Sequence, residues 1–177
     1  MRRTTLVLLL LGSLDARAQW VDKQGVVLPD TADRKSIGAF GAELIFTTNP
    51  DALEERWNTP SDTVHVDSVE SARINEPVSA FVVFSGCTPS RNATCNVSMH
   101  FRVIRPDGGQ YAATPAMEVW RDKPAPTSHR LALSVDYLKI RIEPQEQRGR
   151  YLVQVDVRDE VSGKQIALEK PFVAKDH

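Results

Sequence analysis

A cysteine and a histidine in C-x4-H spacing, Cys95 and His100, are the pair in this sequence best suited to bind a metal ion. Blue-copper sites on β-sandwiches combine one Cys and two His with a weak axial Met. His65 upstream and Met117 downstream would complete such a set. If this segment is a strand, however, His100 lies on its polar face while Met99 points into the core. A metal site is therefore the alternative interpretation, and we expect no cofactor.

His65 and Asp67 are same-face neighbours if residues 63–67 form a strand, and such a pair could act as a catalytic dyad. No Gly-x-Ser-x-Gly elbow, His-Glu-x-x-His pair, Walker loop or Gly-x-Gly-x-x-Gly occurs in the sequence. A solvent-facing polar pair explains the two residues more simply. We therefore predict that the protein is not an enzyme, with a hydrolase that uses His65, Asp67 and His100 as the alternative.

The first residues have the pattern of an export signal. Two arginines precede the apolar run Leu6–Leu11, and Ala16 and Ala18 are the small residues that signal peptidase requires before a cleavage at Gln19. A membrane-spanning helix needs about 20 apolar residues, and this run is much shorter. Residues 1–18 are therefore predicted to be a cleaved signal peptide. We expect a periplasmic or secreted protein with no stable membrane insertion after cleavage.

The two cysteines, Cys87 and Cys95, are then predicted to form a disulfide, because an even count in an exported chain indicates a bridge. A bridged Cys95 has no thiolate to offer to copper, which weakens the metal hypothesis. The bridge would close a short, polar, turn-rich loop that contains Arg91 and Asn92. These two side chains contribute little to a core and are candidates for contact with a partner.

The charge of the chain excludes one class of partner. The formal net charge is −1 at pH 7, with 22 Lys and Arg against 23 Asp and Glu. Affinity for nucleic acid comes largely from clustered basic residues. The basic residues do not cluster here, so nucleic-acid binding is not expected.

Most of the chain has the period-2 alternation of β-strands. We expect an extended leader at 19–36, with an edge strand around 26–28, and a β domain at 37–177. One short helix should begin after Asn49, because Asn is a good cap and Pro50 suits the first helical position. The expected strands and turns are a fully apolar strand at 78–84, alternating strands at 96–103, 131–135, 138–142 and 151–157, and hairpin turns at 107–109 and 160–163.

The last third of the chain resembles the final hairpin of bacterial immunoglobulin-like domains, in the motifs Glu143-Pro144, Gly149–Val157 and Ser162–Lys164. In that family a Tyr near the start of the penultimate strand bonds back across the preceding corner, and Tyr151 has that place. Val153 stands where antibody-type domains have a core Cys. The spacing of the strands predicts an all-β, antiparallel β-sandwich of seven to nine strands with one short helix. The resemblance implies that this sandwich is immunoglobulin-like. The whole chain is also similar to small exported proteins of proteobacteria.

A domain of this kind, without catalytic motifs, is expected to be a binding or assembly module whose partner is another envelope or secreted protein. Its site would be the loop closed by the disulfide or an exposed strand edge, because rigid scaffolds commonly present function on loops. Trp57 and Trp120 are further candidates, since Trp is enriched in interface hot spots. Half-buried core positions are the alternative for both tryptophans.

Overall fold

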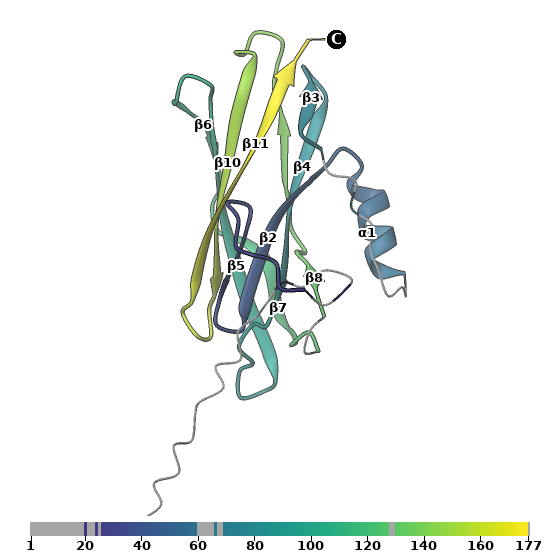
Figure 1. Cartoon of the computed structure of the whole chain (residues 1–177), viewed down its shortest axis with the longest axis vertical. Coiled ribbons are helices and arrows are strands. Elements are labelled where there is room, and N and C mark those ends of the chain that lie inside the picture. The colour runs from purple at the N-terminus through teal and green to yellow at the C-terminus, as the bar shows by residue number, and fades with distance from the viewer. Residues whose placement is uncertain are drawn as a thin grey trace, which may run out of the picture.

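Two β-sheets pack face to face around one core, with a short helix against the outer side of one sheet (Figure 1). The computed structural model describes residues 20, 24, 26–59, 66, 69–127 and 130–176. The expected signal peptide at 1–18, and the pair His65 and Asp67, lie outside the described residues. The predicted all-β sandwich is confirmed, and the described residues contain one short helix.

Within the described part of the chain the first sheet has five strands, all paired antiparallel. Its order is β1-β2-β4-β8, and β9 also pairs with β4. The strands are β1 (Arg34–Ile37), β2 (Phe40–Thr47), β4 (Pro77–Ser85), β8 (Ala132–Leu133) and β9 (Leu138–Arg141).

The second sheet has six strands among the residues that the structure describes, in the order β3-β11-β10-β5-β6, and β7 also pairs with β5. It is not wholly antiparallel as expected, because β3 runs parallel to β11, with Ser71 opposite Val173. The strands are β3 (Ser71–Arg73), β5 (Thr94–Ile104), β6 (Gln110–Ala113), β7 (Met117–Pro124), β10 (Gly149–Asp159) and β11 (Gln165–Lys175).

The described residues contain eleven strands rather than seven to nine, because two return strands are interrupted. β6 and β7 both pair with β5, on either side of a break that contains Pro115, which has no N–H for the ladder. β8 and β9 likewise both pair with β4. The leader also differs from expectation, since its edge strand is Arg34–Ile37 and not 26–28.

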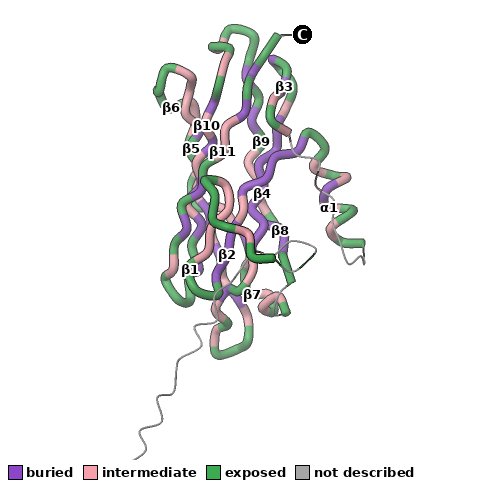
Figure 2. The backbone as a smooth tube through the Cα atoms, viewed as in Figure 1, coloured by how far each residue is buried: buried purple, intermediate pink, exposed green. Residues whose placement is uncertain are grey.

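The core between the sheets is formed by the inward positions of the alternating strands (Figure 2). Burial alternates strictly along β5 and β10, as the period-2 pattern predicts. Tyr151 is fully buried, stacks on Phe172 at 5.6 Å between ring centroids, and donates its hydroxyl to the Gln147 carbonyl at 2.7 Å. The corner bond that the resemblance implied is therefore present.

The outer face of the first sheet carries a second apolar cluster, so β4 is buried on both faces as predicted. The helix α1 (Pro50–Asn58) covers this cluster with Leu53 and Trp57. Its cap is as expected, because the Asn49 side chain accepts a hydrogen bond from the Ala52 N–H at 3.2 Å. The helix therefore completes the packing of this sheet.

Only two residues of the strand expected at 131–135 form a strand, because the chain crosses there from one sheet to the other. Ser134 N–H donates to the Val82 carbonyl of the first sheet at 2.8 Å. Val135 N–H, one residue later, donates to the Val119 carbonyl of the second sheet at 3.0 Å. The side chains of Leu131 and Val135 are consequently exposed, whereas Leu133 is buried.

Candidate functional site

Cys87 and Cys95 form the predicted disulfide, which joins the end of β4 to the start of β5 with a Cα–Cα distance of 6.1 Å. Both cysteines are buried, and the loop between them connects β4 to β5. Two backbone bonds shape that loop, from Ser90 N–H to Thr94 O at 2.7 Å and from Ala93 N–H to Ser90 O at 3.0 Å. Arg91 and Asn92 lie at its exposed tip.

This loop belongs to a group of four turns at one end of the sandwich, which we call the turn cluster: residues 38–39, 86–93, 122–125 and 160–164. Gly86 lies so close to the first turn that a Cβ on it would be 1.7 Å from the Ala39 carbonyl oxygen, and its φ is +65°. Ala125 N–H donates to the Ala93 carbonyl at 3.2 Å. The turns are therefore fixed to one another and not only to their own strands.

Asp159, at the end of β10, is a fully buried acid beneath the turn cluster. Its carboxylate accepts hydrogen bonds from the Ser162 hydroxyl at 2.7 Å, the Thr88 N–H at 2.9 Å and the Val161 N–H at 3.1 Å. Burial alone would raise the pKa of Asp159, but these hydrogen bonds outweigh burial and hold the pKa below its ordinary value. One charged group thus ties the disulfide loop to the β10–β11 turn.

A second polar contact fixes the end of β7 to β5. The Asn96 side chain accepts a hydrogen bond from the Asp122 N–H at 2.9 Å and donates one to the Asp122 carboxylate at 3.2 Å. Asp122 has a φ of +49°, in the left-handed region. Asp tolerates this conformation better than most residues, because its short polar side chain can form local hydrogen bonds.

The two tryptophans are both half-buried and contribute to packing. Trp120 meets the Phe84 ring edge-on at 5.6 Å and donates its Nε1–H to the Pro124 carbonyl at 3.1 Å. The Lys123 ammonium lies 4.8 Å from the Trp120 ring centroid. Trp57, a residue of α1, packs against the second apolar cluster, on a different part of the molecule from Trp120.

The residues of the metal hypothesis do not come together among the described residues. Cys95 is bonded to Cys87, so its sulfur is not available as a thiolate. His100 is half-exposed on the outer face of the second sheet, while Met99 is buried and pairs in register with Met117. In the described part of the chain no three His, Cys, Asp or Glu side chains form a metal-binding group. Nor does any helix there have the length and apolar character needed to cross a membrane.

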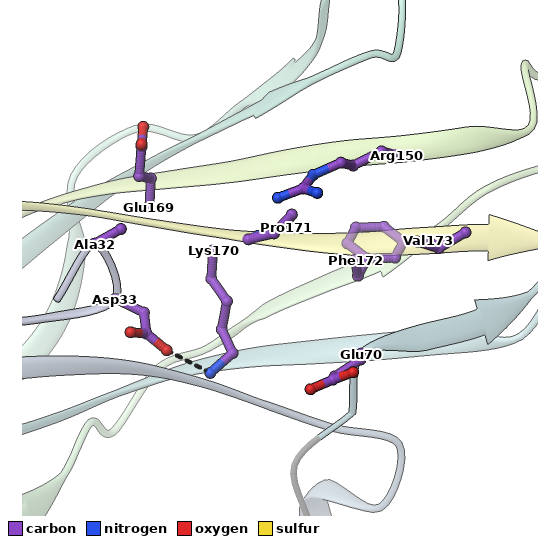
Figure 3. Close-up of a pocket in the computed structure, with 9 residues that line it drawn as sticks. All are labelled: Ala32, Asp33, Glu70, Arg150, Glu169, Lys170, Pro171, Phe172 and Val173. Atoms are coloured by element: carbon purple, nitrogen blue, oxygen red, sulfur yellow. Dashed lines mark hydrogen bonds and ion pairs between the residues drawn. The ribbon is translucent and has the colours of Figure 1, made fainter.

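Sequence reasoning missed a pocket of about 360 Å³ at the edge of β11 (Figure 3). Lys170 and Asp33 point toward each other in it, with the ammonium 2.7 Å from the carboxylate. Burial would raise the pKa of Asp33, but the hydrogen bonds from Lys170 and Thr31 lower it overall. The lining residues are Ala32, Asp33, Glu70, Arg150, Glu169, Lys170, Pro171, Phe172 and Val173.

Two signals in the sequence could have pointed to these sites. Asp159 continues the inward series of Tyr151, Val153, Val155 and Val157 at the same period of two. Lys170 likewise occupies an inward position of β11, in series with Leu168 and Phe172. A charged residue in an inward position needs a partner, so each break in the pattern predicts a polar contact.

The sequence matches no protein-family model and no curated protein sequence. A family 123 glycoside hydrolase from Clostridium perfringens superposes with a TM-score of 0.46 at 13% identity, covering 78% of this chain and 27% of that one. An alkylpurine DNA glycosylase from Pseudomonas fluorescens superposes with a TM-score of 0.36 at 13% identity. The match covers 60% of this chain and 28% of that one. The CARDB domain of a Pyrococcus furiosus protein superposes with a TM-score of 0.36 at 10% identity. The match covers 84% of this chain and 99% of that one. This chain spans less than a third of either enzyme chain, and TM-scores of this size carry no inference about activity.

Proposed function

We propose that this chain is an exported binding or assembly module of the periplasm or cell surface, with no chemistry of its own. Its turn cluster contacts another envelope or secreted protein. The observation that supports this proposal most is the exposed tip of the disulfide loop, Arg91 and Asn92, held on a rigid base.

The rigidity of that base is the physical argument for binding. A loop that is ordered before association loses less conformational entropy when a partner binds. Here the bridge and the hydrogen bond from Thr88 N–H to Asp159 both order the loop. Neither contact involves the side chains of Arg91 and Asn92, which leaves these side chains available for a partner.

The double substitution Arg91→Ala/Asn92→Ala tests the site. Exposed substitutions of this kind change stability by less than about 0.5 kcal/mol, so the melting temperature should stay close to that of the wild type. Cross-linking in the native envelope should capture a partner with the wild type and lose it with the double variant. Lys139→Ala, which removes an exposed cation on β9, is the control and should keep the partner. Identical cross-linked species for all three proteins would rule out the tip of the loop.

Export is tested separately by the intact mass of the protein from a periplasmic extract. Cleavage after Ala18 should leave a chain that begins at Gln19. A mass that still includes residues 1–18 would contradict the export proposal without bearing on the loop.

A further inference from the structure

The turn cluster carries large apolar side chains that folding leaves exposed. Ile37, directly before the first turn, is 45% exposed, and Val161, in the β10–β11 turn, is 40% exposed. A Cβ on Gly38 would lie 3.1 Å from the Lys164 ammonium, so the first turn lies against the β10–β11 turn. Ile37 and Val161 therefore belong to neighbouring turns at one exposed end of the sandwich (Figure 2).

The cations of the turn cluster have no carboxylate partner among the described residues. Arg91 and Lys164 take part in none of the ion pairs of that part of the chain. The Lys123 ammonium faces the Trp120 ring and not a carboxylate. The turns therefore present positive charge that this part of the chain does not neutralise.

The exposed acids of the same turns are already bonded within the molecule. The Glu160 carboxylate forms an ion pair with Arg158 at 3.2 Å and accepts a hydrogen bond from the Ser98 hydroxyl. The Asp122 carboxylate accepts a hydrogen bond from the Asn96 side chain. An incoming surface consequently meets unpaired cations and apolar side chains, while the carboxylates already have partners.

We propose that the turn cluster binds an apolar area of its partner protein that is bordered by carboxylates. This inference rests on the proposed function and names the chemistry of the partner. Carboxylates opposite Arg91 and Lys164 complement two charges that lack a partner here, and such complementarity gives protein association its specificity. Ile37 and Val161 supply the apolar contact, because removing their exposed surface from water favours association.

An anionic lipid surface is the other target that suits cations beside apolar side chains. Such a surface presents one sign of charge throughout, so it would also face the exposed carboxylates of Asp122 and Glu160. A protein can place its carboxylates opposite the cations alone. The mixed charge of the turn cluster therefore favours a protein.

A photo-crosslinking amino acid at Ala39, which is exposed in the first turn, identifies the surface that the cluster contacts. Cross-linking is carried out in the native envelope, and the cross-linked peptide is identified by mass spectrometry. The partner segment should be rich in Asp and Glu next to apolar residues. A basic partner segment, or capture of lipid alone, would contradict the proposal.

Two variants separate the charge from the apolar contact. Lys164→Glu and Ile37→Ser/Val161→Ser should each lower the cross-linked fraction at least about fivefold, the loss that marks a contributing interface residue. Added salt should weaken capture by the wild type more than capture by Lys164→Glu, because salt screens the attraction between opposite charges. The matched controls are Lys139→Glu and Val173→Ser, at exposed positions elsewhere, which should capture as the wild type does.

Melting temperatures close to that of the wild type show that the variants are folded. Full capture by folded Lys164→Glu and Ile37→Ser/Val161→Ser, with capture lost in Arg91→Ala/Asn92→Ala, would overturn this inference and leave the proposed function intact. Full capture by all of these variants would reject both. Binding to phosphatidylglycerol vesicles that Lys164→Glu abolishes would assign the cluster to a membrane surface and overturn the protein partner.

Discussion

At the scale of single residues, Asp159 is the side chain on which the turn cluster depends most. A buried carboxylate that accepts hydrogen bonds from three backbone N–H groups and a hydroxyl has no equivalent among neutral side chains. In the variant Asp159→Asn, amide hydrogens would face some of these donors. We expect a loss of about 1.5–3 kcal/mol in the free energy of unfolding, the range for hydrogen bonds to charged groups.

The same residue predicts an acid dependence. Since the pKa of Asp159 is lowered on folding, its ionised form stabilises the fold above the unfolded pKa, ordinarily 3.8. That contribution is lost as pH falls from about 4 through the folded pKa. Urea midpoints at about pH 7 and about pH 3 should differ more for the wild type than for Asp159→Asn. Asp30→Asn, at an exposed position, should behave as the wild type.

Tyr151 carries a second prediction at this scale. Burial raises the pKa of its hydroxyl, and the nearby Glu146 adds to the effect. Tyr151→Phe keeps the ring in the core but removes the bond to the Gln147 carbonyl, and should cost about 1 kcal/mol in urea unfolding. Alkaline spectrophotometric titration should then show one fewer late-titrating tyrosine. An unchanged urea midpoint would show that the corner bond does not stabilise the fold.

At the scale of elements, the disulfide loop is a local constraint on a fold that is held together elsewhere. The bridge spans a sequence separation of 8, and a ring of that size contributes about 2–3 kcal/mol in the chain-entropy model. Reduction, or the double variant Cys87→Ala/Cys95→Ala, should lower unfolding stability by that amount and leave the β-sheet circular dichroism intact. Reductant should not change the unfolding stability of the double variant. If it did not change the stability of the wild type either, the expected contribution of the bridge would be contradicted.

The elements are also where prediction from sequence succeeded and failed. Strands β4, β5 and β10 were predictable because each buries a regular set of side chains, and α1 because Asn49 and Pro50 mark its start. The break within β6–β7 and the crossing near Ser134 were not, because both depend on which neighbour the backbone pairs with. The disulfide was predictable from cysteine count. The contact between Thr88 and Asp159 joins residues that no local pattern connects.

At the scale of the whole molecule, the two sheets are joined by backbone as well as by core packing. Residues 134 and 135 donate to different sheets, and residues 32–35 make a similar connection between β2 and β11. These crossings fix the sheets relative to each other. The parallel pairing of β3 with β11 could not be predicted either, since three residues of β3 have no alternation of their own.

The crossing at Val135 can be tested by comparing one variant that keeps the backbone N–H of this residue with one that removes it. Its side chain is 42% exposed, so Val135→Ala should be nearly neutral. Val135→Pro also removes the N–H that bonds to Val119, and should cost at least about 1 kcal/mol more than Val135→Ala. Urea unfolding of the two variants measures this difference. Equal midpoints would mean that the bond from Val135 to Val119 does not help to hold the two sheets together.

The parallel pairing also determines when β3 can find its partner strand during synthesis of the chain. Ser71 pairs with Val173, about 100 residues later. At a synthesis rate of about 5–20 residues per second, β3 is made roughly 5–20 s before the strand that lies beside it. β11 is also the partner of β10 and of the segment at Ala32, so neither of these can complete its contacts earlier. This sandwich therefore closes only once β11 has been made, and a chain cut short before β11 is left with β10 as an open edge.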